Sequence, residues 1–144
     1  MESIESKIEQ VVFARFFEGE NLLEAIASAA KGSSVDSGFF FLIGTLKEAV
    51  LGYYQEGKYI PIEKRGPLEI VSCMGNVSAR KNDEIVVHGH IAVSDSDGNA
   101  FGGHILDGCL VDATVELVLV KTESGKLKRA FDPSRNLYLW ALGK

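Results

Sequence analysis

The chain has 144 residues, of which 46% are hydrophobic and 24% charged, and its formal net charge is -5. This length is typical of one domain, so we expect a single domain over residues 1–144. The composition excludes collagenous, low-complexity and disordered proteins. The acidic balance disfavours a protein that binds nucleic acid through a basic face alone.

The N-terminal residues M-E-S-I-E-S-K are acidic and lack the apolar core of a signal peptide. No apolar run approaches the length of a membrane span. We therefore expect a cytoplasmic protein that has no membrane partner. Cys73 and Cys109 each lie in an apolar run without a C-x-x-C neighbour, which favours reduced packing residues over a disulfide or a redox pair.

The first predicted elements are a strand and then a helix. Residues 8–17 are rich in β-branched and aromatic side chains, which is typical of a strand. Residues 20–31 place apolar side chains at helical spacing, with acids early and Lys31 late, and Gly32 is a natural stop. This is the one principal helix that we expect.

The rest of the chain alternates between strand patterns and turn residues. Turns are predicted at residues 55–57, 65–67, 81–83, 97–98 and 124–125. The strands between them are predicted at residues 39–46, 48–54, 58–62, 68–79, 84–94, 99–105, 109–120, 127–131 and 137–140. The sequence thus predicts an α+β domain made mainly of antiparallel sheet, with its helix after the first strand.

All three histidines lie in the run V-V-H-G-H-I-A-V-S-D-S-D-G-N-A-F-G-G-H, residues 86–104. In the predicted strand 84–94 the odd positions form an apolar face, so His88 and His90 point together to the other face. Their Cβ atoms should lie about 6.5–7 Å apart, close enough for both imidazoles to reach one ion. The alternative is that they are ordinary surface or packing histidines.

Whether His104 joins this pair depends on the hairpin between the two strands. A two-residue loop at 97–98 would place His104 on the wrong side of the sheet. A three-residue loop at 96–98, with Gly98 in the left-handed conformation, would make His90 and His104 direct cross-strand neighbours. We favour the three-residue loop, and with it a site made of three imidazoles.

Three neutral imidazoles favour zinc, or another late first-row metal, over magnesium or calcium, which prefer oxygen ligands. Three protein ligands leave a position open for water or a small anionic ligand. Glu116 and Asp112, on the less apolar face of strand 109–120, are candidates for a fourth metal ligand or for accepting an imidazole N–H. Both can equally be charges that face solvent.

Arg15 is a further candidate for ligand binding. It interrupts an apolar strand, so we expect a partly buried guanidinium with an anionic partner, either Glu69 or a ligand. The alternative is an arginine that extends to solvent from a sheet edge. The basic runs at 64–65 and 126–129 are interpreted as solvated turns with flanking charges.

The sequence contains no G-x-S-x-G elbow, Walker loop or dinucleotide-binding glycine motif. The run D-S-D-G-N begins like a calcium loop, but Ala100 and Leu106 occupy its sixth and twelfth positions, so we reject a calcium site. Whether the protein is an enzyme is left open by the sequence. Glu116 is the nearest candidate for a general base beside a zinc-bound water.

Four segments together resemble the PPC domain, the plant and prokaryote conserved family. They are A-R-F-F-E-G-E-N-L-L-E-A-I (14–26), G-F-F-F-L-I-G-T-L (38–46), H-G-H-I-A-V-S-D-S-D-G-N-A-F-G-G-H-I (88–105) and T-V-E-L-V (114–118). The resemblance spans nearly the whole chain and implies an α+β unit that assembles as a homotrimer. It also implies a metal site at His88, His90 and His104.

The resemblance further offers DNA-associated regulation as an alternative function, because prokaryotic members are often described as predicted DNA-binding proteins. Plant members join the domain to AT-hooks, which need an R-G-R-P core to lie in the minor groove. The nearest run here, K-R-G-P at 64–67, lacks the second arginine. A third interpretation is an assembly module that recruits protein partners through an edge strand.

Overall fold

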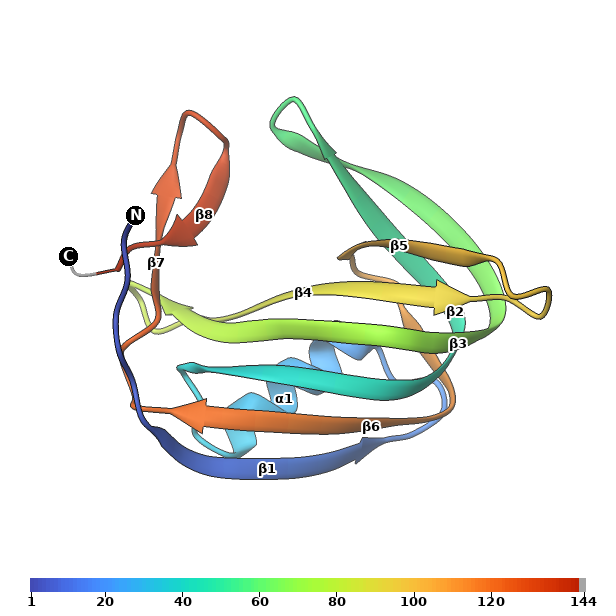
Figure 1. The fold of residues 1–144 in the computed structure, drawn as a ribbon, viewed down its shortest axis with the longest axis horizontal. Helices are drawn as coiled ribbons and strands as arrows, with labels where there is room; N and C mark the ends of the chain where they lie inside the picture. The colour runs from blue at the N-terminus through green and yellow to red at the C-terminus, as the bar shows by residue number, and fades with distance from the viewer. Residues whose placement is uncertain (143–144) are drawn as a thin grey trace.

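The computed structural model describes residues 1–142 and contains one α-helix and eight strands within that range (Figure 1). The helix follows the first strand, as predicted, but the sheet dominates the fold more than the α+β prediction implies. In chain order the elements are β1 (Ile8–Phe16), α1 (Leu22–Gly32), β2 (Gly38–Gln55), β3 (Lys58–Arg80), β4 (Ile85–Ser94), β5 (Ala100–Ile105), β6 (Leu110–Thr122), β7 (Lys128–Asp132) and β8 (Leu137–Trp140).

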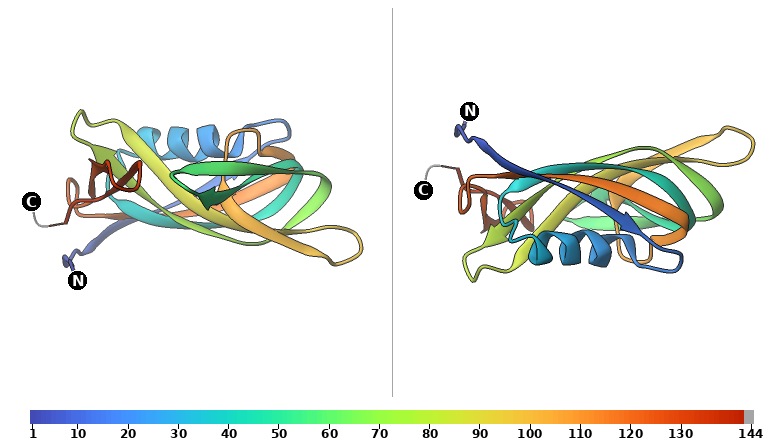
Figure 2. Two further views of the ribbon diagram at one scale, coloured as in Figure 1. Left: turned by 90° about the horizontal axis from the view of Figure 1, so that it is seen from above. Right: turned by 90° about the horizontal axis from the view of Figure 1, so that it is seen from below.

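Helix α1 begins after Asn21, whose side chain accepts hydrogen bonds from the backbone N–H groups of Leu23 and Glu24. This N-cap satisfies two amides that have no partner inside the helix. One face of the helix, with Leu22 and Ile26, is fully buried against the sheet. Figure 2 shows the helix lying along one face of the sheet, while the opposite face has no helix over it.

Two predicted pairs of strands are each a single long strand. The predicted break at Lys47 is an irregularity in the pairing of β2, which continues to Gln55. The predicted turn at 65–67 is wrong, because β3 runs through it and Arg65 and Leu68 still pair with β2. Pro67 is tolerated there because β4 pairs with β3 only from Glu69 onward, which leaves one edge of this segment without a strand partner.

The strand order is β1-β6-β2-β5-β4-β3-β7-β8, and β2 pairs with β3 as well. Strands β2, β3, β4 and β5 therefore form a closed ring in which each pairs with the next. All pairings are antiparallel except β3 with β7. The hairpin tips of β2–β3 and β7–β8 rise on the same side of the molecule (Figure 1).

The hydrophobic core lies between α1 and the sheet. Phe40 on β2, Ile91 on β4 and Leu117 on β6 are among its buried side chains. Cys73 and Cys109 are free and buried, which agrees with the prediction of packing residues. Among residues 1–142, no helix has both the length and the apolar character needed to cross a membrane.

The face of the sheet away from the helix is apolar but exposed. Residues opposite each other form a row from β1 to β5: Phe13, Val118, Phe41, Met74, His90 and His104. Phe13 is 77% exposed and Met74 63%. We call the exposed apolar side chains of this face the outer apolar face; they are Val11, Phe13, Phe39, Phe41, Ile43 and Met74.

Candidate metal centre

Strand β4 carries two of the histidines on one face. Gly89 and Ile91 are buried beneath it, while His88 is half-buried and His90 exposed. This alternation is the predicted one, and it arises because successive residues of a strand point to opposite faces. His88 and His90 thus point away from the core, with ring centroids 5.4 Å apart.

The turn between β4 and β5 has the predicted three-residue geometry. The backbone N–H of Asp95 donates to the carbonyl of Asn99, and Gly98 adopts a φ of 79°. The Asp95 carboxylate accepts hydrogen bonds from the backbone N–H groups of Asp97 and Asn99, so it stabilises the turn. This register pairs His90 directly with His104.

The three imidazoles converge on one point. One ring nitrogen from each of His88, His90 and His104 lies within 4.8 Å of the others. Nitrogens bound to one tetrahedral zinc ion are about 3.4 Å apart, so small side-chain rotations would close the site. The buried Nδ1 of His104 has no hydrogen-bond partner within residues 1–142. An unpaired nitrogen beside two other imidazoles fits a metal ligand.

Tyr59 and Arg129 lie next to the three histidines, although the sequence did not predict either of them as a site residue. The ring of Tyr59, on β3, stacks on His104 with centroids 4.2 Å apart and planes 12° apart. On β7, Arg129 places its Nη2 atom 3.3 Å from the Nδ1 atom of His88. Arg129 is only 6% exposed, so the interpretation of residues 126–129 as a solvated turn is wrong for this side chain.

The environment favours neutral imidazoles. The pKa of His104 is lowered to about 4, mainly by burial and then by electrostatic interactions with His88, His90 and Arg129. Burial is also the main cause that lowers the pKa of His88, followed by Arg129 and His90. Both rings are therefore uncharged at neutral pH, which is the form that binds a metal ion.

The three other candidate residues lie elsewhere on the sheet. Glu116 pairs with Arg15 on β1 and with Ile43 on β2, and it is separated from β4 by β2 and β3. Three strand spacings are about 14 Å, too far for a hydrogen bond to an imidazole. Asp112 lies further along β6, and neither acid belongs to the cluster of potential metal ligands found in the described residues.

The expected partial burial of Arg15 is wrong, because its side chain is exposed, which agrees with the alternative of an arginine that extends to solvent. Its Nε donates to the Oγ1 atom of Thr114 at 3.1 Å, and its guanidinium lies over the ring of Phe17. Glu69 is also exposed, and it pairs with Thr45 and Ser94. The apolar residues on the same face as Arg15, Phe13 and Phe17, are themselves exposed, so they do not bury it.

This fold, with a histidine cluster on its sheet, defines a small β-rich domain with a candidate metal centre. Residues 3–123 match the profile of the Plants and Prokaryotes Conserved domain, so the chain belongs to that family, the PPC family named above. β7 and β8 lie outside the matched range.

Solved structures share the fold. A plant- and prokaryote-conserved protein of Pyrococcus horikoshii is 30% identical, with a TM-score of 0.88 over 100% of this chain and 99% of that one. A metal-containing protein of Archaeoglobus fulgidus is 28% identical, with a TM-score of 0.88 over 97% and 99% of the two chains. A protein of Bacteroides thetaiotaomicron, named as a candidate for DNA binding, is 22% identical with a TM-score of 0.84 over 96% and 99%.

A curated relative contains a similar segment within a longer chain. The bifunctional protein GlmU of a Synechococcus strain is 30% identical over 122 residues, which is 83% of this chain. The match spans 18% of that relative's own length.

Proposed function

We propose that this protein is a zinc-binding member of the PPC family, in which His88, His90 and His104 hold the metal. The convergence of one nitrogen from each ring within 4.8 Å is the observation that carries this proposal. The similarity to the metal-containing protein of Archaeoglobus fulgidus supports it. Three imidazoles favour zinc or another late first-row ion.

The proposed site has a free position for water or a small anion. Only the three histidines make up the potential ligand group within the described residues, whereas structural zinc sites usually have four protein ligands. A zinc ion at such an open site acts as a Lewis acid and lowers the pKa of its bound water. Glu116 is too far away to serve as a general base, so we propose binding and no reaction.

Elemental analysis of the purified protein, together with competition against a chromophoric chelator, tests the site. We expect one zinc ion per chain in the wild type and none in the variant in which all three histidines are alanine. Glu116→Gln is the matched control, because it removes a candidate acid away from the cluster, and it should keep its zinc. Equal zinc in the wild type and the triple variant would refute the proposal.

We also propose that the protein is a homotrimer. The outer apolar face supports this, because large apolar side chains that are contiguous on a surface mark interaction sites. A ring of three copies would cover this face without leaving an open end. The row from Phe13 to His104 connects the face to the metal centre, so the site lies at its border.

A DNA-associated regulator is the second candidate function, and it rests on the family resemblance. The charge of -5 disfavours it. The K-R-G-P run lies within β3 and pairs with β2, so it is not a free arm that could enter a minor groove. Gel-shift titrations with duplex DNA at low salt distinguish the two functions; DNA binding with a measurable salt slope would favour the regulator.

We propose a cytoplasmic location for the protein. Two free, buried cysteines support a reducing compartment, where thiols persist.

A further inference from the structure

A cavity of about 240 Å³ lies beside the histidine cluster. His88, His104 and Tyr59 line one part of it, and the β7–β8 hairpin lines another. Its lining includes Arg80 and Arg129 but no acidic residue, although the chain as a whole is acidic. The cavity is smaller than the roughly 300–1,000 Å³ of sites for drug-sized ligands, so its ligand must be small.

Arg129 is a buried cation without a counter-ion. Its Nε donates to Ser78 at 2.7 Å, its Nη1 to the carbonyl of Tyr138 at 2.7 Å and its Nη2 to Asn76 at 2.9 Å. All three acceptors are neutral, and no ion pair of Arg129 exists within residues 1–142. A buried charge that is hydrogen-bonded but not neutralised favours an anion in the adjoining space.

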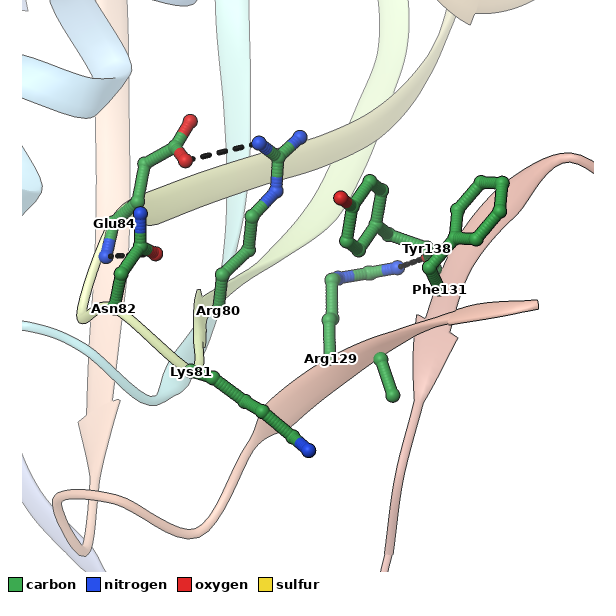
Figure 3. A pocket seen from close by; sticks show the side chains of 8 residues that line it. Arg80, Lys81, Asn82, Glu84, Arg129, Phe131 and Tyr138 are labelled. Carbon is green, nitrogen blue, oxygen red and sulfur yellow. Dashed lines mark hydrogen bonds and ion pairs between the residues drawn. The ribbon is translucent and has the colours of Figure 1, made fainter. Parts of the chain in front are cut away.

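The other arginine differs in this respect. Arg80 already pairs with Glu84 at 2.9 Å, and its guanidinium lies over the ring of Tyr138 (Figure 3). Figure 3 also shows Arg129 beside Tyr138, at the base of the β7–β8 hairpin, in a second pocket that shares these residues. Of these two arginines, Arg129 is therefore the one whose positive charge has no anionic partner among the described residues.

The hydrogen bond between Arg129 and His88 connects the cavity to the metal centre. A guanidinium has only donors, so the Nδ1 atom of His88 accepts from Arg129, and the one proton of the neutral ring is on Nε2. If a metal takes Nε2, the proton moves to Nδ1, which then no longer accepts. If a metal takes Nδ1, Arg129 is displaced directly. Both routes break this hydrogen bond and free Nη2 for another acceptor.

The remaining walls of the cavity are apolar. Val86, Leu137 and Leu139 line it together with the ring of Tyr138. An anion that is held by Arg129 would thus have hydrocarbon around the rest of its body.

We propose that this cavity binds a small carboxylate with a compact apolar body, whose carboxylate group pairs with Arg129 beside the zinc site. This inference rests on the proposed zinc function. Because zinc frees the Arg129 donor, zinc and carboxylate bind with positive coupling, and each raises the affinity for the other by the same factor. The β7–β8 hairpin, outside the family match, supplies the specificity.

Isothermal titration calorimetry with benzoate as the probe tests the inference on the zinc-loaded and the metal-free protein. Benzamide is the matched neutral ligand. Arg129→Met removes the cation, and Arg135→Gln, an exposed arginine of the same hairpin that pairs with Asp132, is the matched control. Zinc affinity is measured for each protein with and without benzoate, and circular dichroism reports folding.

We expect benzoate to bind the zinc-loaded wild type and zinc-loaded Arg135→Gln with equal affinity. Its affinity for the metal-free wild type and for Arg129→Met should be at least tenfold lower. Benzamide should bind at least tenfold more weakly than benzoate.

Equal affinities for benzoate and benzamide in the wild type would overturn the inference even if Arg129→Met fails to fold. Benzoate binding that Arg129→Met retains would overturn it as well, because the anion would then contact the metal alone. Absence of zinc binding by the wild type without benzoate would instead refute the zinc site, and this inference with it.

Discussion

Tyr59 and His104 form a parallel stack, with ring centroids 4.2 Å apart, in which the β2–β3 hairpin covers an imidazole of β5. Tyr54 packs edge-on against Tyr59, and its hydroxyl donates to the carbonyl of Arg135 between β7 and β8. The side chain of Asn136 donates to the carbonyl of Gly57. The two hairpins that border the cavity therefore contact each other, and the β2–β3 hairpin places Tyr59 against the His104 ring.

Removing this stack should weaken the metal site. In Tyr59→Ala we expect about a tenfold loss of zinc affinity, which is typical when a residue that orients a metal ligand is lost. Tyr59→Phe keeps the aromatic ring and should stay within twofold of the wild type. Chelator competition measures both affinities. Equal losses in the two variants would mean that the hydroxyl, not the stacked ring, is what matters.

Gly75 should be intolerant of any side chain. It pairs with Gly89 beneath the histidines, and a Cβ atom there would overlap the carbonyl oxygen of His88 and the Cζ atom of Phe40. We expect Gly75→Ala to lower the free energy of unfolding by about 3 kcal/mol. Gly32→Ala, where nothing lies within 4 Å, should change it by no more than about 1 kcal/mol. Urea denaturation measures both.

The outer apolar face should control assembly. Phe41 is 49% exposed at the centre of the row, so Phe41→Glu would place a charge in the proposed interface. We expect sedimentation equilibrium to give the mass of a trimer for the wild type and of a monomer for Phe41→Glu. Phe131→Glu, at an equally exposed phenylalanine of β7, should remain a trimer. A monomeric wild type would contradict the proposed assembly.

The two thiols should be unreactive in the folded protein. Burial raises the pKa of Cys73 to about 12, and burial is also the main cause that raises the pKa of Cys109. At pH 8 almost no thiolate is present, and thiolate is the form that alkylating reagents attack. We expect iodoacetamide to label neither cysteine in the native protein and both in guanidinium chloride, as measured by mass spectrometry.

Acid should destabilise the metal-free protein through His104. Its pKa is about 4 in the folded state and 6.5 as the ordinary value, so the unfolded chain binds more protons between these two values. Stability is therefore fully present above pH 6.5 and is lost as the pH falls through 4. The stability of His104→Gln should fall less steeply over this range in urea denaturation. Identical slopes in the two proteins would contradict the assigned environment.

The sequence was sufficient to predict the histidine cluster because its determinants are local. Strand alternation orients His88 and His90, and the conformation of Gly98 brings His104 opposite His90. The break at Lys47 and the turn at Pro67 were wrong because polar residues and proline also occur at irregular, partly unpaired places within long strands.

Arg129 and Tyr59 were missed because long-range pairing brings them to the site. Arg129 arrives through the parallel contact of β7 with β3, and Tyr59 through the end of the β2–β3 hairpin. A lone arginine in a basic run carries no local sign of burial. Arg15 shows the opposite error, since apolar neighbours on an outward face do not bury a side chain.

The ring formed by β2, β3, β4 and β5 has a consequence for how this site can vary among related chains. A slip of β4 by one residue would turn Ile91 outward and the histidines into the core, and it would have to be matched by both neighbours, β3 and β5. The strand register that aligns the imidazoles is thus the same register that buries Ile91 in the hydrophobic core. Mutations that preserve this closed ring preserve the strand register that aligns the imidazoles, while the terminal hairpin lies outside the ring and contacts the site through Arg129.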